Sequence, residues 1–390
     1  YGATQGIFAV ESTVNKLADR LSMDPIVLRQ KNMIHEGDVM PAYYGETANS
    51  CRLEECLLKA SDMIGWKEKG MRTVMPDGKI RARGVAMAMQ GSSISNCDVG
   101  SVTVKLSDEG TYHITVGCTD MGTGCDTIIA QFAADVLETP IDNISVYGVD
   151  TDISPYDSGS YASSTTYLTG MAAVKACEQL RERIIALAAV RMNKDASALT
   201  FDGENVIDES DGAKMSLFDI ATASMCNNEI SLEVTYSHSS PVSPPPFMAA
   251  CAEIEADPET GAIELLDYTA CVDCGTVVNT NLARVQTEGG LLQGIGMTLY
   301  EDIWYDERGK NLSNSFMQYK VPSRLDTDRI RVEFDSSYEP TGPFGAKSIG
   351  EIVINTPAPA IADAVYNATG VWINELPITP EKILKGMKVI

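Results

Sequence analysis

One order of elements, a β-hairpin, then a glycine-containing loop, then a helix, occurs twice in this 390-residue chain and constrains its fold more than any other feature. In residues 101–116 apolar side chains alternate with polar ones on both sides of a turn, as in a hairpin, and a glycine-rich loop follows at residues 117–124. Residues 248–271, which turn at residues 257–261, repeat the hairpin before a second loop and helix. Two copies predict a duplicated α+β unit rather than one uninterrupted βαβ series.

The remainder of the chain divides around these two copies. Residues 1–80 carry apolar side chains mainly at helical spacing, which predicts a helical N-terminal segment. We expect the first copy over residues 81–238 and the second over residues 248–390, with the proline-rich residues 239–247 as a stiff linker between them. The chain begins at Tyr1, inside an organised segment and without a preceding signal region, so we expect this segment to continue an upstream part.

Composition excludes several classes of function. The 54 acidic and 30 basic residues give a formal net charge of −24, which repels phosphate backbones and anionic lipids and argues against nucleic-acid binding or membrane attachment. Every apolar run is well short of the roughly 18 residues that a membrane-spanning helix needs. The ten cysteines are scattered through a large chain, which favours a reducing cytoplasm. The pair Cys271 and Cys274 has metal-like spacing but no second pair that would complete a zinc site.

Two glycine loops suggest nucleotide binding and fail the detailed tests. Residues 122–124 could begin a dinucleotide fingerprint, but Thr127 stands where the third glycine belongs. Residues 342–350 superficially suggest a phosphate-binding Walker loop, but Ala346 separates the glycine from the lysine. This second loop nevertheless delivers a carboxylate, Glu351, just before a helix, where it is either a partner of the helix dipole or a catalytic group.

A third segment, residues 157–166, is rich in serine and threonine and leads into a long helix that we expect to end near Met192. Hydroxyl groups and free amides at a helix start can cap the helix or hold an anion. Capping needs only one hydroxyl, so the surplus favours a ligand.

Four segments together resemble the molybdenum-binding subunit of the xanthine dehydrogenase and aldehyde oxidase family, the molybdenum hydroxylases. In order, they read GCTDMGTGCDT, DTDISPYDSGSYASSTTY, DCGTVVNTNLARVQTEGGLLQGIGMTLYE and GAKSIGE. The resemblance covers essentially the whole chain and implies an α+β fold of duplicated two-layer α/β molybdenum-cofactor-binding domains with mixed sheets. It also implies that the chain is the C-terminal portion of the subunit, lacking the first half of the cofactor site.

The resemblance implies roles for individual residues. Glu351 matches the active-site glutamate, which is the general base, and Gln286 matches a glutamine that contacts the pterin. Tyr1 and Ala162 match positions of the substrate pocket, and Ala162 would lie close to the metal. The molybdenum itself would have no direct protein ligand. The pterin and its phosphate would be held by Met121, Gly122, Thr123, Gly124, Ser160, Ala162, Ser163, Ser164 and Thr165.

The implied cofactor is a molybdopterin, in bacteria often the cytosine dinucleotide form, with 2Fe-2S clusters and FAD expected on partner domains or subunits. The implied reaction oxidises an N-heterocycle of xanthine-like type, or an aldehyde, with oxygen derived from water. Two alternatives stay open at this point. One is an aryl-CoA dehydroxylating reductase of the same family, and the other is a non-catalytic scaffold half of such a complex.

Two departures from the family pattern limit what the resemblance implies. Thr123 stands where the family commonly has glutamine, so one hydrogen bond to the cofactor would be absent or remade. Residues 90–93 contain no aromatic side chain, although this region supplies a stacking phenylalanine in purine-oxidising relatives. The sequence therefore leaves the identity of the substrate and the oligomeric state open.

Overall fold

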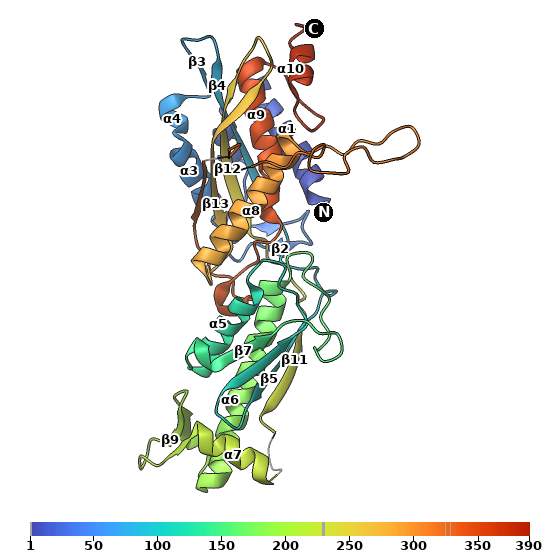
Figure 1. Cartoon of the computed structure of the whole chain (residues 1–390). Coiled ribbons are helices and arrows are strands. Elements are labelled where there is room, and N and C mark those ends of the chain that lie inside the picture. The colour runs from blue at the N-terminus through green and yellow to red at the C-terminus, as the bar shows by residue number, and fades with distance from the viewer. Residues whose placement is uncertain (1, 228–230, 324, 328) are drawn as a thin grey trace. The chain divides into compact units, whose positions relative to one another are not determined.

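The computed structural model describes residues 2–227, 231–323, 325–327 and 329–390, and the chain groups into two compact units (Figure 1). Unit 1 consists of Tyr1–Gln90, Pro244–Tyr338 and Ile349–Ile390, whereas unit 2 consists of Gly91–Ser243 and Glu339–Ser348. The chain therefore passes between the units several times, and neither unit is a continuous stretch of sequence.

These bounds differ from the division expected from the sequence. Strand β4 (Ile80–Met89) belongs to unit 1 rather than to the first copy, because it pairs along its whole length with β12 (Phe247–Ala256). The expected linker, residues 239–247, does contain the boundary between Ser243 and Pro244, but its prolines 244–246 are buried, so it is not an exposed spacer.

Unit 1 is built on a five-stranded mixed sheet. Its strand order is β14 (Ile330–Phe334), β13 (Ile263–Asp273), β12, β4 and β3 (Arg72–Val74). The pair β13 and β14 is parallel, and the other neighbours are antiparallel. The long apolar runs of β4, β12 and β13 are buried on both faces, as expected of central strands.

Helices cover both faces of this sheet. Helix α3 (Leu53–Ile64) packs on one face, and α9 (Pro357–Thr369) and α8 (Thr280–Leu299) pack on the other. Helix α9 approaches β4 so closely that a Cβ atom on Gly84 would lie 2.1 Å from the carbonyl oxygen of Ala360. Helix α3 comes from the N-terminal segment and covers the other face of the sheet. Unit 1 therefore has three layers rather than the two expected.

The N-terminal segment is mainly helical, as its spacing predicts. The cap of α2 is formed as the sequence suggests, since the Asp24 side chain accepts a hydrogen bond from the Ile26 amide at 2.7 Å. The remaining elements of unit 1 are α1 (Ala3–Arg20), α2 (Pro25–Gln30), α4 (Trp66–Lys69), α10 (Pro380–Gly386) and the short strands β1 (Val39–Met40) and β2 (Glu46–Thr47).

Unit 2 is built on a four-stranded mixed sheet with the order β11 (Glu233–His238), β5 (Gly100–Leu106), β6 (Tyr112–Val116) and β7 (Ile144–Tyr147). Its main helices are α5 (Cys125–Leu137) and α6 (Gly170–Met192), which pack against each other and on this sheet. A smaller three-stranded sheet and a helix lie beside α6. These are β8 (Leu199–Phe201), β9 (Asn205–Asp208), β10 (Lys214–Ser216) and α7 (Leu217–Asn227).

The two units repeat one chain path. In unit 2 the hairpin β5–β6 leads through α5 to β7, which is parallel to β6, and then to α6. In unit 1 the hairpin β12–β13 leads through α8 to β14, which is parallel to β13, and then to α9. The predicted duplicated α+β fold with mixed sheets is therefore confirmed.

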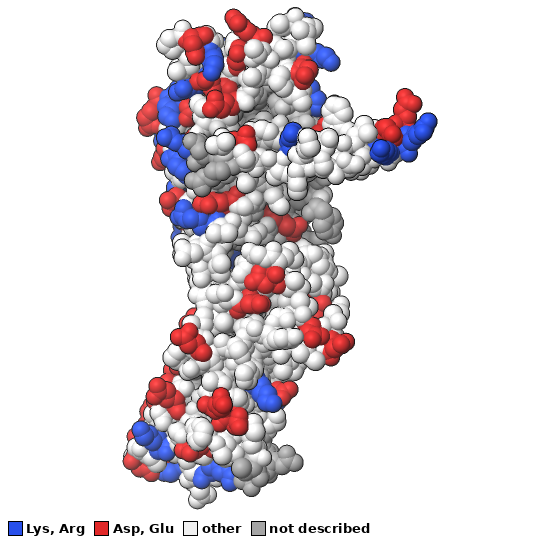
Figure 2. Space-filling view, viewed as in Figure 1, with Lys and Arg blue, Asp and Glu red and all other residues white. Residues whose placement is uncertain are grey.

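No helix in the described part of the chain is both long and apolar enough to cross a bilayer. Acidic side chains are spread over the visible faces of both units, with basic side chains interspersed among them (Figure 2). This distribution agrees with the net charge of −24.

Candidate functional site

Two of the segments singled out in the sequence meet in unit 2. We call residues 117–124, between β6 and α5, the glycine loop, and residues 157–166, which precede α6, the serine loop. The Ser160 hydroxyl donates to the backbone oxygen of Thr119 at 3.3 Å. A Cβ atom on Gly117 would lie only 2.5 Å from the side chain of the first serine-loop residue. The glycine at this position therefore permits the contact between the two loops.

The glycine loop is held by a carboxylate of its own. Asp120 Oδ1 accepts hydrogen bonds from the amides of Gly122 at 2.9 Å and Gly124 at 3.1 Å. Both glycines have positive φ values, +101° and +73°, which glycine adopts without strain. The Met121 side chain is 64% exposed. The sequence analysis missed Asp120, although aspartate two residues before a glycine is a common turn signal.

The serine loop contains strained backbone. Ala162 and Ser163 have φ values of 51° and 56°, a left-handed region that side chains with a Cβ atom rarely adopt. The carbonyl of Ala162 accepts a hydrogen bond from the amide of Ser93 at 2.8 Å, and Ser93 itself has a φ of 93°. Such strain persists only where surrounding contacts enforce it, and it is concentrated at functional sites.

Side chains fix the serine loop at both ends. The Tyr161 hydroxyl donates to the buried carboxylate of Asp98 at 2.7 Å, and this hydrogen bond raises the pKa of Tyr161 to about 12. The Ser164 hydroxyl donates to the carbonyl of Gly159 at 3.0 Å rather than capping the following helix. Thr165 begins the single π-helical turn that leads into α6. These side chains therefore order the loop, and none of them caps α6.

Buried hydroxyl groups lie next to the serine loop. The amide of Ser348 donates to the Ser92 hydroxyl at 3.1 Å, and the amide of Ser92 donates to the Ser243 hydroxyl at the same distance. Among the described residues, the buried hydroxyl oxygens of Ser93, Ser95 and Ser348 have no hydrogen-bond partner. An unpaired buried polar group costs about 1–3 kcal/mol, so these hydroxyls fit a polar ligand better than an empty site. The sequence signal is the serine-rich stretch SSIS at residues 92–95, next to the residues 90–93 noted above only for their lack of an aromatic.

Glu351 and Gln286 lie together in unit 1. Gln286, on α8, donates from Nε2 to the carbonyl of Gly350 at 3.1 Å and so fixes the residue before Glu351. A pocket of about 600 Å³ adjoins this segment, and Glu351 is one of its lining residues. The other side chains that line it include apolar Phe8, Met297, Ile354 and Leu376 and polar Thr4, Gln5, Gln293, Asn355 and Asn374.

Two glycines of α8 allow the Glu351 segment to lie against the helix. A Cβ atom on Gly290 would be 2.1 Å from Val353 Cγ2, and one on Gly294 would be 2.5 Å from the Pro357 ring. Neither glycine has a positive φ, so both are required for space rather than for backbone conformation. This close packing positions the Glu351 carboxylate beside the pocket.

The predicted site residues thus fall into two groups. Glu351 and Gln286 belong to unit 1, and the candidates of the glycine and serine loops belong to unit 2. Each group is brought together within its own unit. Tyr1, the predicted pocket aromatic, lies outside the described residues.

Comparison with known proteins identifies the family. Residues 59–328, which are more than half of the chain, match the molybdopterin cofactor-binding domain. The chain belongs to the molybdopterin cofactor-binding domain family. The resemblance to the molybdenum-binding subunits of xanthine dehydrogenases and aldehyde oxidoreductases is confirmed by relatives with those names, which align over nearly all of this molybdopterin-binding chain.

Several relatives of this molybdopterin-binding chain are longer than it. A "probable hypoxanthine oxidase" of Escherichia coli strain K12 is 37% identical over 402 residues, covering 100% of this chain and 42% of that protein. The xanthine dehydrogenase molybdenum-binding subunit of Escherichia coli O157:H7 is 32% identical over 393 residues, covering 98% of this chain and 52% of that subunit. Quinoline 2-oxidoreductase from Pseudomonas putida 86 superposes with a TM-score of 0.88 at 25% identity, over 99% of this chain and 52% of that one. The chain therefore spans about half the length of the relatives it matches.

Proposed function

We propose that this chain forms the C-terminal cofactor-binding part of the catalytic subunit of a molybdenum hydroxylase, with Glu351 as its general base. The observation that carries the proposal is the placement of Glu351 beside a pocket of about 600 Å³, on a segment that Gln286 and the glycines of α8 hold in place. A general base must be fixed within hydrogen-bond reach of the proton that it removes. The named relatives of this family supply the reaction class.

The residues of unit 2 fit a molybdopterin. The buried, unpartnered hydroxyls of Ser93 and Ser348 would donate to its polar groups. The glycine-loop residues and the strained serine loop, with Ser160, Ser163, Ser164 and Thr165, would surround it. When bound, the cofactor supplies a redox-active metal that takes up two electrons for each substrate molecule oxidised. We expect the cytosine dinucleotide form, with electrons passing to 2Fe-2S clusters and FAD on partner domains or subunits.

The role of Glu351 is proton transfer. Its carboxylate accepts a proton as the substrate is hydroxylated, and a positioned base of this kind contributes roughly 10²–10⁴ in rate. The pocket beside it has apolar side chains such as Phe8 and Leu376 and neutral amides such as Asn355, with no lysine or arginine in its lining among the described residues. Such a surface suits a neutral N-heterocycle or an aldehyde better than an anionic substrate.

The first prediction tests Glu351 directly. In the complete enzyme, Glu351→Gln is expected to lower kcat by at least about 10²-fold, because the amide keeps the size of the side chain but cannot accept the proton. Molybdenum content should stay at the wild-type level. Turnover is measured with a panel of N-heterocycles and aldehydes and an artificial electron acceptor, and molybdenum by elemental analysis.

Glu375→Gln is the matched control. Glu375 is an exposed carboxylate of unit 1 that does not line the pocket, so its amide variant should keep full turnover. Undiminished turnover in Glu351→Gln would refute the catalytic assignment. Wild-type enzyme without molybdenum would favour the scaffold alternative, and activity only in the direction of aryl-CoA dehydroxylation would favour the reductase.

A further inference from the structure

Two thiols face each other at the base of the glycine loop. Cys118 follows β6, Cys125 begins α5, and their Sγ atoms lie 4.0 Å apart. Both are free thiols and almost completely buried, with exposed fractions of 0% and 4%. The thiol of Cys125 also lies 3.7 Å from Asp126 Oδ1. The two ends of this eight-residue segment therefore lie close together, with the two thiols and the Asp126 carboxylate next to one another.

A second carboxylate completes the cluster. One potential ligand atom from each of Asp120, Cys125 and Asp126 lies within 4.8 Å of the other two. In a tetrahedral zinc site, with Zn–S of about 2.3 Å and Zn–O of about 2.0–2.2 Å, neighbouring ligand atoms are roughly 3.3–3.8 Å apart. These three ligand atoms would therefore have to approach one another by about 1 Å to reach metal-binding geometry. Cys118, whose Sγ lies 4.0 Å from that of Cys125, would supply the fourth ligand.

The electrostatics of the cluster favour a cation. Two carboxylates and two thiols lie together here, and a bound cation would offset the negative charge of their ionised forms. Asp120 uses Oδ1 for the amides of Gly122 and Gly124, and this leaves Oδ2 as a possible ligand.

We propose that Cys118, Asp120, Cys125 and Asp126 bind a thiophilic divalent cation such as Zn²⁺. Two sulfur and two oxygen donors suit Zn²⁺ or Cd²⁺ and do not suit Mg²⁺ or Ca²⁺, which take oxygen ligands only. Binding replaces the two S–H bonds by two metal–sulfur bonds and releases two protons to solvent. The ion would close the base of the glycine loop. All four of its ligands are residues of this chain, so the site does not require a bound molybdopterin.

Cadmium titration tests the site. The full chain, reduced and kept without oxygen, should bind one equivalent of Cd²⁺ with the ultraviolet charge-transfer absorption of cadmium thiolate, and Zn²⁺ should displace it. Cys125→Ser should lose this absorption. Asp120→Asn, which retains an oxygen for the loop amides but loses the charge, should weaken binding by at least about 10-fold. Binding should be accompanied by the release of two protons, measured in weakly buffered solution.

Cys97→Ser is the matched control, because Cys97 is an exposed free thiol outside the cluster and its variant should bind Cd²⁺ like the wild type. Circular dichroism and thermal unfolding establish that each variant is folded. The proposal is overturned if folded Cys125→Ser and Cys118→Ser both bind Cd²⁺ as the wild type does. It is also overturned if the reduced wild-type chain shows no cadmium–thiolate absorption. That result overturns it even if these two cysteines form a disulfide when the chain is oxidised.

Discussion

At the scale of single residues, α9 carries a buried carboxyl group outside the proposed site. Asp363 Oδ2 accepts a hydrogen bond from the amide of Val85 at 3.1 Å. A buried ion pair between Arg29 and Glu11, 2.7 Å apart, contributes smaller, opposing effects on this carboxyl. Burial dominates and raises the pKa of Asp363 to about 7 from an ordinary value of 3.8. The folded chain therefore holds a proton there that the unfolded chain releases.

This proton gives stability a predictable pH dependence. Because the pKa is higher in the folded state, the contribution is complete below pH 4 and is lost as the pH rises through about 7. A shift of this size corresponds to roughly 4 kcal/mol, at about 1.4 kcal/mol per pKa unit. Asp363→Asn, which is neutral at every pH, should therefore gain stability relative to the wild type between pH 5 and 8, measured by urea unfolding. If the unfolding free energies of Asp363→Asn and the wild type depend on pH in the same way, the assignment is contradicted. Asp152→Asn, at an exposed position, is the control.

At the scale of elements, the sequence predicts local structure well and long-range contacts poorly. The spacing of apolar residues predicts α1, α3, α5 and both hairpins, because each depends on neighbours in the chain. The position of β4 depends instead on its pairing with β12, more than 150 residues away, and no local pattern encodes that partner. The motifs point to the glycine and serine loops, but the hydrogen bond between Ser93 and Ala162 depends on the fold and has no signal in the local sequence.

The close contact between α9 and β4 leads to a prediction at this scale. Gly84→Ala would place a Cβ atom 2.1 Å from the backbone oxygen of Ala360, so the helix must move, and we expect a loss of about 2–3 kcal/mol of unfolding free energy. Gly6→Ala on α1 is the matched control, since no atom lies within 4 Å of its Cβ position. That substitution should stabilise the helix by about 0.5–1 kcal/mol. Chemical denaturation measures both, and equal effects would show that α9 does not pack on Gly84.

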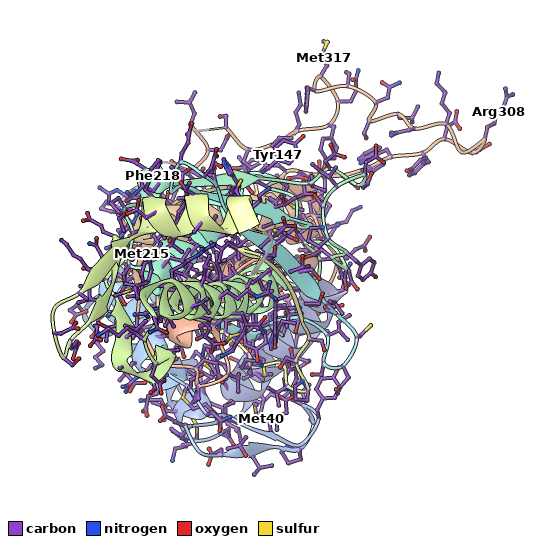
Figure 3. The ribbon with its side chains drawn as sticks, turned by 90° about the horizontal axis from the view of Figure 1, so that it is seen from below. Met40, Tyr147, Met215, Phe218, Arg308 and Met317 are labelled. Carbon is purple, nitrogen blue, oxygen red and sulfur yellow. The ribbon has the colours of Figure 1, made fainter. Side chains whose placement is uncertain are left out.

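Residues 301–323, which follow α8, project from unit 1 as a long arm (Figure 1). It exposes large apolar side chains, with Phe316 83% and Met317 80% accessible, and Figure 3 shows Arg308 and Met317 on this projection. Trypsin should therefore cleave first after Arg308 or Lys310, which intact-mass analysis of a brief digest would locate. Because the arm contributes no strand to the five-stranded sheet, circular dichroism of the nicked chain should stay unchanged. First cleavage after Lys59, within α3, would contradict this prediction.

At the scale of the whole molecule, the chain forms two compact units yet spans only 42–52% of the length of the relatives described above. A molybdopterin held by loops of unit 2 would, on our proposal, also need groups from the remainder of such a subunit. We therefore expect the chain expressed alone to contain well under one equivalent of molybdenum. Co-expression with the upstream part of the subunit should restore one equivalent, measured by elemental analysis.

A double variant in that restored complex separates cofactor binding from folding. Ser93→Ala combined with Ser348→Ala removes two buried hydroxyls that have no hydrogen-bond partner among the described residues. If these groups serve only the fold, their removal should leave stability equal or higher, since an unsatisfied buried group costs about 1–3 kcal/mol, and molybdenum content should not change. If they hold the cofactor, molybdenum content should fall at unchanged or increased thermal stability of the cofactor-free chain. Full molybdenum content in the double variant would exclude these serines from the site and leave the glycine and serine loops as its support in unit 2.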